Sequence, residues 1–283
     1  MARKTGEITV NGATLFYEVS GEGEPLVLVH AGIADLRMWD PQVNSFSRSY
    51  QVVRHDMRGF GRSPMVPGPY AHHEDLRALL DHLGVDRATL VGCSLGGATT
   101  IDFALQNPER VEALILVGSA IGGFQFDAEP PKEWDELVAA DEAGDLDRVS
   151  ELEVGMWVDG PNRPPDAVDP AIRDLVREMN LIALQNEALE LGEERELDPP
   201  AVDRLPEIQA PTLILVGDED QPRTLAAADL LAKELPNSQK TAITHTAHLP
   251  NMERPEKFNN LVLSFLRSQE RGPRSGPQRA KSQ

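Results

Sequence analysis

One stretch decides the fold of this chain: VGCSLGG, residues 91–97. It follows the apolar run 88–91 and precedes a segment with helical character at 98–106. A serine between two glycines at a strand-to-helix turn is the G-x-S-x-G pattern, in which a tight turn exposes the serine hydroxyl. We expect Gly92 and Gly96 where strand and helix lie too close together to leave room for side chains.

The tight turn would place the hydroxyl of Ser94 at the carboxyl edge of a sheet, above the N-terminus of the following helix. Free backbone N–H groups and the positive end of the helix dipole suit a developing oxyanion there. The alternative is an ordinary glycine-rich turn in which Ser94 only caps a helix, and the rest of the chain argues against it. Cys93 precedes the serine, and we expect it to be a small buried packing residue rather than a thiol nucleophile.

Length and composition limit the class of protein. The chain has 283 residues, 40% of them hydrophobic, enough for one large α/β domain with an insertion or for two small domains. The net charge of −19 argues against nucleic acid and anionic membrane surfaces as partners. The single cysteine excludes an intrachain disulfide and predicts a reducing, cytoplasmic location. We expect no signal peptide and no membrane span, because no apolar run is long enough.

Strand and helix patterns alternate along the chain. Asn11-Gly12 between two β-rich runs predicts a hairpin, at 8–10 and 14–19. Further strands are expected at 26–29, 51–54, 88–91, 111–117, 210–216 and 239–244, and helices at 74–83, 98–106, 224–235 and 256–266. This alternation predicts a parallel sheet with helices on both faces.

The alternation stops between residues 122 and 205. That region has no strand-like run, is acidic, and combines helical periodicity with proline breaks. We interpret residues 122–205 as a helical cap inserted into an α/β core made of residues 1–121 and 206–270. The last segment, 271–283, consists mostly of Gly, Pro, Ser, Gln and basic residues, so we expect it to be disordered.

A serine hydroxyl needs a base to remove its proton and a third group to orient that base. In a parallel sheet such groups converge at the carboxyl ends of the strands. A cluster of carboxylates, Asp218, Glu219 and Asp220, follows one late strand. His245 and His248 follow the last one. The order serine, acid, histidine is therefore present, with several candidates for each partner.

Four motifs in this order resemble the α/β-hydrolase fold superfamily, in particular its esterase, enol-lactonase and haloperoxidase-like serine hydrolases. They are His30-Ala31-Gly32 with Trp39 further on, DMRGFGRS at 56–63, GCSLGG at 92–97, and GDED at 217–220 followed by HLPNMERP at 248–255. The resemblance covers roughly residues 8–266 and is weakest in the cap. It implies a mostly parallel eight-stranded sheet with helices on both faces and a helical cap insertion. Ala31 departs from the usual family glycine, and alanine should slightly restrict that loop.

The resemblance also selects among the candidates. The family acid closes a G-x-x-D pattern, which is Asp220, and Asp218 and Glu219 are then solvated or turn-capping residues. The family histidine precedes a helix start of the form E-x-P, which matches His248, with His245 as the second choice. Ser94 is then the nucleophile of a Ser-His-Asp catalytic triad.

Further roles follow from the same resemblance. The oxyanion hole is expected to consist of the backbone amides of Gly32 and Leu95. His30 should hold the oxyanion loop by hydrogen bonding, and Arg58 should form a structural ion pair. Candidates for the substrate pocket are Ile33, Trp134, Trp157 and Leu249.

The remaining histidines are expected to be surface or structural residues: His55, His72, His73 and His82. The run His72-His73-Glu74-Asp75 could suggest a metal site. Adjacent histidines do not share a helical face, however, and acids are favoured at a helix start in any case. We therefore expect no metal and no cofactor.

The predicted function is that of a serine hydrolase that cleaves a carboxylic ester or lactone through an acyl-enzyme intermediate. Its partner would be a small-molecule ester or lactone, and the protein would be a monomer or homodimer. The alternatives are a carbon–carbon bond hydrolase or perhydrolase with the same triad, an aminopeptidase relative whose cap carboxylate holds a substrate amine, and a slow-turnover small-molecule receptor. The negative net charge should disfavour anionic substrates and favour neutral or cationic ones.

Overall fold

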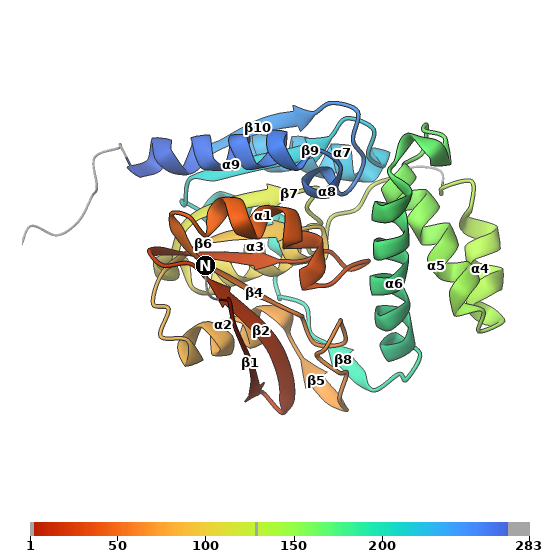
Figure 1. Ribbon diagram of the computed structural model, residues 1–283, viewed down its shortest axis with the longest axis horizontal. Coiled ribbons are helices and arrows are strands. Elements are labelled where there is room, and N and C mark those ends of the chain that lie inside the picture. Colours follow the sequence, from red (N-terminus) through yellow and green to blue (C-terminus); the bar gives the residue numbers. More distant parts are fainter. Residues whose placement is uncertain (1–2, 128–129, 271–283) are drawn as a thin grey trace, which may run out of the picture.

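The computed structural model describes residues 3–127 and 130–270, and the tail predicted to be disordered lies outside them. The strands are β1 (Arg3–Val10), β2 (Ala13–Ser20), β3 (Glu24–Val29), β4 (Tyr50–His55), β5 (Gly68–Tyr70), β6 (Ala88–Cys93), β7 (Val111–Val117), β8 (Gly192–Glu194), β9 (Thr212–Gly217) and β10 (Ser238–Ile243). Within the described residues, eight of them form one sheet in the order β1-β2-β4-β3-β6-β7-β9-β10 (Figure 1). Only the pairs β1–β2 and β2–β4 are antiparallel. The predicted mostly parallel eight-stranded sheet is thus confirmed.

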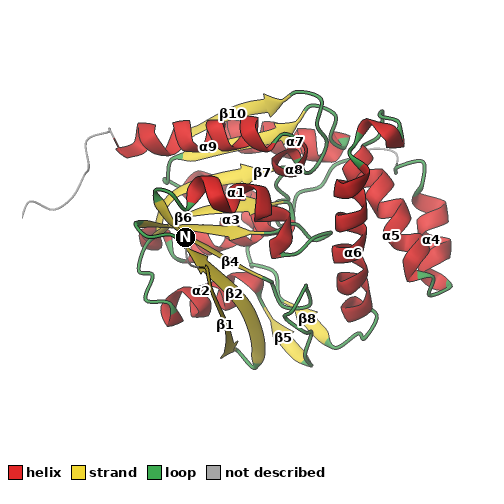
Figure 2. Cartoon of the chain, in the orientation of Figure 1, coloured by secondary structure: helices red, strands yellow, loops and turns green. Residues whose placement is uncertain are grey.

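The helices are α1 (Asp40–Phe46), α2 (His72–His82), α3 (Leu95–Gln106), α4 (Trp134–Glu142), α5 (Leu146–Val154), α6 (Pro170–Glu187), α7 (Pro222–Glu234), α8 (Pro250–Glu253) and α9 (Pro255–Glu270). Short helical turns occur at Leu36–Trp39, Pro108–Arg110, Gly155–Asp159, Pro165–Ala167, Ala201–Asp203 and Leu205–Glu207. Helix α1 packs beside α9, and α2 packs beside α3. These two groups cover opposite faces of the sheet (Figure 2).

Alternation along each buried strand divides the core into two layers. In β3, Leu26 and Leu28 pack with Trp39 and Phe258 in the layer under α1 and α9. Val27 and Val29 point the other way, into the layer under α2, α3 and α7. Successive side chains of a strand point to opposite faces of the sheet. A strand that is apolar throughout therefore needs packing partners on both faces.

The N-terminal hairpin forms as predicted. Strands β1 and β2 pair in register up to Val10 and Ala13. Asn11 and Gly12 between them have φ values of 48° and 80°. Positive φ at both central residues matches the twist of a two-residue hairpin, which explains the Asn-Gly sequence.

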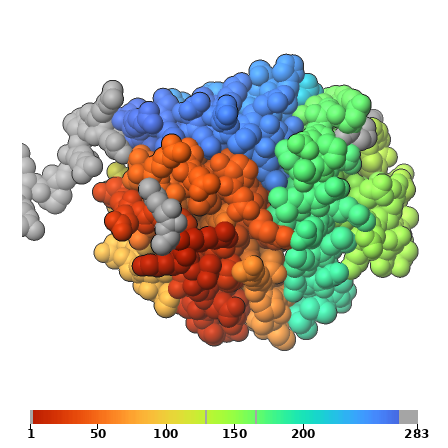
Figure 3. Space-filling view, in the orientation of Figure 1, coloured from red at the N-terminus to blue at the C-terminus, as the bar shows by residue number. Residues whose placement is uncertain are grey.

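Helices α4, α5 and α6 lie together at the side toward which the parallel strands run (Figure 1). In the space-filling view their atoms, drawn in green, lie directly against the rest of the chain (Figure 3). The expectation of no strand in residues 122–205 is wrong, because β8 pairs in parallel with β5 there. This strand has three residues, two of them exposed glutamates, and so gives no apolar pattern.

The sheet has a topological crevice between β3 and β6. These strands are neighbours, with Val29 opposite Gly92. The helices that follow them, α1 and α3, lie on opposite faces of the sheet. The loops after two such strands diverge and leave a crevice at the carboxyl edge, where ligands of α/β sheets bind. This crevice lies between the loop that contains Gly32 and the turn that contains Ser94.

Candidate active site

Ser94 occupies a strained turn between β6 and α3. Its backbone has φ 52° and ψ −115°, in the positive-φ region that non-glycine residues rarely adopt. A Cβ atom on Gly92 would overlap the backbone of Gly96, and one on Gly96 would overlap the carbonyl group of Val29. The predicted need for glycine at both positions is confirmed, because strand and helix almost touch on either side of the serine.

Asp220 and His248 form a buried pair. Nδ1 of His248 lies 2.9 Å from Oδ2 and 3.1 Å from Oδ1 of Asp220. The two residues are only 2% and 3% exposed. The backbone N–H of Gln221 also donates to Oδ1 of Asp220, at 2.7 Å. A carboxylate next to Nδ1 keeps the proton on that nitrogen, and Nε2 is then free to accept a proton.

The backbone links the serine turn to this pair. The N–H of Ser94 donates to the carbonyl oxygen of Val117, at 3.0 Å. The next residue, Gly118, lies against the pair: a Cβ there would stand 3.2 Å from both Oδ2 of Asp220 and Nδ1 of His248. Sγ of Cys93 lies 3.8 Å from the carbonyl oxygen of His248. The structure therefore brings the serine turn, the acid and the histidine to one edge of the sheet.

The second-choice candidates lie apart from this pair. Oδ1 of Asp218 accepts a hydrogen bond from the backbone N–H of His245, at 2.7 Å. Both residues are exposed, and His245 has a φ of 59°. Asp218 thus stabilises the turn after β10, which agrees with the turn-capping role expected for it.

His30 fixes the loop after β3. Its Nδ1 donates to the carbonyl oxygen of Ala31 at 2.8 Å, and its Nε2 accepts from the N–H of Met57 at 2.9 Å. Complete burial lowers the pKa of His30 to about 4, so the ring is neutral and can serve both bonds. Gly32 of this loop lies against Leu95, with 3.6 Å from a Cβ on Gly32 to Cβ of Leu95. The two residues predicted to supply oxyanion amides are therefore neighbours.

Asp56 stabilises the same loop, a role that its position in the sequence does not reveal. Its carboxylate accepts from the backbone N–H groups of Leu36 and Arg62, each at 2.9 Å. Burial raises the pKa of Asp56 to about 7, although these two hydrogen bonds oppose the shift. Arg58 pairs with buried Asp75 at 2.9 Å, as the structural role predicted for it requires.

The region predicted to form a cap, residues 122–205, contacts the histidine through the turn Gly155–Asp159. The rings of Trp157 and His248 lie 4.7 Å apart between centroids, and the N–H of His248 donates to the carbonyl oxygen of Trp157 at 3.3 Å. Nε2 of Gln221 donates to the carbonyl oxygen of Met156, at 2.6 Å. The sequence does not reveal this contact between Gln221 and Met156, because nothing in the region 122–205 shows which of its turns reaches the core.

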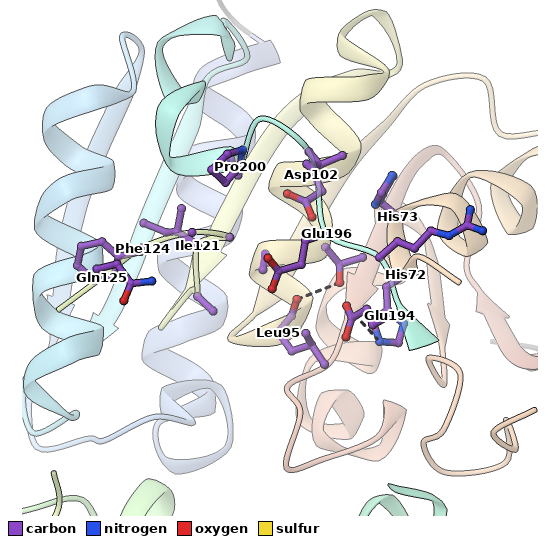
Figure 4. Close-up of a pocket in the computed structure, with 18 of the residues that line it drawn as sticks. His72, His73, Leu95, Asp102, Ile121, Phe124, Gln125, Glu194, Glu196 and Pro200 are labelled. Atoms are coloured by element: carbon purple, nitrogen blue, oxygen red, sulfur yellow. Dashed lines mark hydrogen bonds and ion pairs between the residues drawn. The ribbon is translucent and has the colours of Figure 1, made fainter. Parts of the chain in front are cut away.

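Two cavities meet beside Leu95. One, of about 380 Å³, is lined by Gly32, Ile33, Leu95 and residues of the cap. The other, of about 310 Å³, extends along α3 to Asp102 (Figure 4). Both are lined by Leu95, His72 and Glu194. These cavities adjoin the helix N-terminus that follows Ser94 and offer space for a small molecule.

The other pocket candidates lie in different surroundings. Ile33 lines the larger cavity, and the ring of Trp157 lies against that of His248 at a tilt of 41°. Leu249 is fully buried in the core layer under α1 and α9. Trp134 is 46% exposed and lies outside the lining of both cavities. A pocket role for each of the four stays a prediction.

Cys93 and most remaining histidines are buried. Cys93 has no exposed surface, and burial raises the pKa of its thiol, which confirms a packing residue. His55 and His72 are also buried, and burial lowers the pKa of each to about 3. His82 is exposed. These positions agree with surface or structural roles.

Comparisons with known proteins identify the family of this chain. A family model described as the alpha/beta hydrolase fold matches residues 24–152. The structure matches that of a hydrolase from Pseudomonas aeruginosa PA01 with a TM-score of 0.75 and 30% identity, over 93% of this chain and 98% of the other. The chain therefore belongs to the α/β-hydrolase family.

Curated relatives of the chain include hydrolases of two kinds. A 2-hydroxy-6-oxononadienedioate/2-hydroxy-6-oxononatrienedioate hydrolase from Burkholderia vietnamiensis is 29% identical, over 89% of this chain and 90% of its own length. The 3-oxoadipate enol-lactonase 2 of Acinetobacter baylyi is 27% identical, over 92% of this chain and 96% of its own length.

Among the described residues, no helix has both the length and the apolar character needed to cross a bilayer.

Proposed function

We propose that the protein is a serine hydrolase that cleaves a carboxylic ester or lactone with a Ser94-His248-Asp220 triad. The observation that carries this proposal is the buried Asp220–His248 pair, 2.9 Å apart, beside the strained turn of Ser94. The likeness to an enol-lactonase supports it, because a lactone is a cyclic ester. A reducing, cytoplasmic location is part of the proposal and is supported by the single, buried cysteine.

The chemistry assigns one role to each side chain. Oγ of Ser94 attacks the carbonyl carbon while Nε2 of His248 accepts the hydroxyl proton. Asp220 keeps the other ring proton on Nδ1 and stabilises the imidazolium that forms. His248 then gives its proton to the leaving alkoxide, which leaves an acyl group on Ser94. Water, activated by the same ring nitrogen, releases the carboxylic acid and restores the serine.

The tetrahedral intermediates carry a negative oxygen. The backbone N–H groups of Gly32 and Leu95 are proposed to donate to it, and each such donor contributes about 3–4 kcal/mol to lowering the barrier. The N-terminus of α3 adds its positive dipole end. His30 and Asp56 hold the Gly32 loop through their backbone hydrogen bonds.

The test is hydrolysis of short p-nitrophenyl esters and covalent labelling with a fluorophosphonate. Wild type should show both, and Ser94→Ala should show neither while it keeps the wild-type melting temperature. Full activity in Ser94→Ala would show that Ser94 is not the nucleophile. Labelling without turnover would favour a receptor that binds a small molecule and hydrolyses it very slowly.

A carbon–carbon bond hydrolase is the second candidate, because the Burkholderia relative acts on 2-hydroxy-6-oxononadienedioate. Adding a vinylogous diketone to the ester assays separates the two reactions. A higher kcat/KM for the diketone than for every ester would favour this candidate. A preference for esters would leave the ester hydrolase as the activity of the site.

A further inference from the structure

The two cavities beside Leu95 are rich in carboxylates. The larger cavity is lined by four glutamates: Glu153, Glu187, Glu190 and Glu194. Among the described residues that line it, no lysine or arginine occurs. The smaller cavity adds Asp102 and Glu196, with two arginines, Arg195 and Arg223. A substrate that reaches Leu95 through the larger cavity thus passes only neutral and negative side chains.

Within the described chain, none of these carboxylates forms an ion pair with a lysine or arginine, although the charge of Arg204 acts on Asp102. Glu153 accepts one hydrogen bond, from Nδ2 of Asn180 at 2.7 Å, and forms no ion pair. Burial raises its pKa, and the nearby charges of Glu187 and Asp141 add to the shift. Oε1 of Glu194 lies 3.9 Å from Nε2 of His72, whose ring is neutral, and burial together with the charge of Glu196 raises the pKa of Glu194. A carboxylate whose pKa is raised by burial is one that a bound cation would stabilise.

His72 supplies the second, independent sign of a ligand. Its side chain is 4% exposed, and within the described chain neither Nδ1 nor Nε2 of its ring has a hydrogen-bond partner. Its Nε2 lies 3.9 Å from Oε1 of Glu194, too far for a hydrogen bond. Figure 4 shows the ring and the carboxylate facing each other in the cavity wall. A neutral ring nitrogen and a carboxylate at this separation can both accept from one N–H donor group between them.

We propose that the substrate of this site carries a positively charged group, an alkylammonium or guanidinium, that binds between Glu194 and His72 with further attraction from Glu153. This inference rests on the proposed ester hydrolase and adds its substrate class. Leu95 lines both cavities, so a cation bound at Glu194 lies on the same surface as the proposed oxyanion amide. By the same argument, the site rejects dicarboxylates such as the dioate named for the Burkholderia relative.

The test uses three p-nitrophenyl esters whose acyl chains have equal length and end in an ammonium group, a methyl group or a carboxylate. Wild type should hydrolyse the ammonium ester with a kcat/KM about fivefold above that of the methyl ester, as expected for a half-exposed pair. The carboxylate ester should be the poorest substrate. Added salt should reduce these differences, because it screens charges near the surface.

Glu194→Gln keeps the shape of the side chain and removes its charge. It should bring the ratio of kcat/KM between the ammonium ester and the methyl ester close to one, mainly by raising KM for the ammonium ester. Glu142→Gln is the matched control, because Glu142 is an exposed cap residue outside both cavities. Equal kcat/KM for all three esters in wild type would overturn the inference, as would an unchanged preference in both Glu194→Gln and Glu153→Gln.

A binding measurement separates this inference from the proposed function. Calorimetry with hexylammonium, hexanol and hexanoate needs no turnover. Tighter binding of hexylammonium than hexanol by wild type, lost in Glu194→Gln, would support the cation site even if no ester were hydrolysed. Ser94-dependent hydrolysis of the methyl ester without any hexylammonium binding would uphold the hydrolase and reject the cation site.

Discussion

Arg163 of the cap and Glu253 of α8 form a buried ion pair, with 2.7 Å between Nη1 and Oε2. The guanidinium also donates to the carbonyl oxygens of Val158, Asp159 and His245. Oε1 of Glu253 accepts from the backbone N–H of Ala247, at 2.8 Å. The pair therefore ties the cap turn to the loop that carries His248. We assign both residues a positioning role.

Glu253→Ala should lower the free energy of unfolding by about 3 kcal/mol, because it leaves the Arg163 charge buried without its partner. It should also lower kcat more than it raises KM, since the His248 loop loses an anchor. Urea denaturation and steady-state kinetics measure the two effects. Glu207→Ala, which breaks the more exposed pair with Arg204, is the control and should change stability by less than about 1 kcal/mol. Equal effects in both variants would contradict the positioning role.

Asp220→Asn should leave the fold intact and lower kcat by about 10³–10⁴-fold. The amide can donate to Nδ1, which would hold the wrong histidine tautomer and leave Nε2 protonated. The rate of p-nitrophenyl ester hydrolysis and the melting temperature check this together. Asp218→Asn is the matched control, because its carboxylate only bonds the N–H of His245. A comparable loss of kcat in Asp218→Asn would mean that the acid has been assigned to the wrong residue.

Gly96→Ala should destabilise the protein by several kcal/mol or prevent folding. A Cβ there would overlap the backbone carbonyl groups of Val29 and His30, which cannot move without displacing β3. Gly122→Ala is the control, since its Cβ would meet Ala201 at an ordinary 3.7 Å. The melting temperatures of the two variants, each compared with that of wild type, measure the loss of stability. A wild-type value for Gly96→Ala would show that the serine turn is less tight than the structure has it.

The buried histidines predict a loss of stability in acid. Burial lowers the pKa of His55 from 6.5 to about 3, with smaller effects of His30 and His72. Between these pH values the unfolded chain binds a proton that the folded chain does not, so stability falls as pH drops below about 6.5 and is fully present above it. Each such histidine contributes a slope of about 1.4 kcal/mol per pH unit.

His55→Gln isolates one of these contributions. Urea unfolding of wild type and variant at about pH 7.5 and about pH 5 gives the change in unfolding free energy for each. The variant should lose less stability between the two pH values than wild type does. An identical loss in both proteins would show that His55 stays protonated in the folded state or is not buried.

Much of the fold was predictable from local sequence. Continuous apolar runs such as 26–29 and 212–216 are typical of strands that are covered on both faces, and Asn11-Gly12 favours a hairpin. Short elements were not predicted. Strands β5 and β8 have three residues each, and they pair although they lie more than a hundred residues apart in the chain. Nothing in Gly192–Glu194 itself indicates a strand.

The sequence by itself determined the order of strands and helices, the tight turn at Ser94, and the position of an acid and a histidine after two late strands. Each of these depends on neighbouring residues, through side-chain periodicity or backbone sterics. Only the tertiary structure decided that His248 meets Asp220 while His245 bonds Asp218, that Arg163 anchors the histidine loop, and that Glu194 faces His72 in an acidic cavity. These contacts join residues far apart in the chain, and the packing of the cap on the sheet sets them.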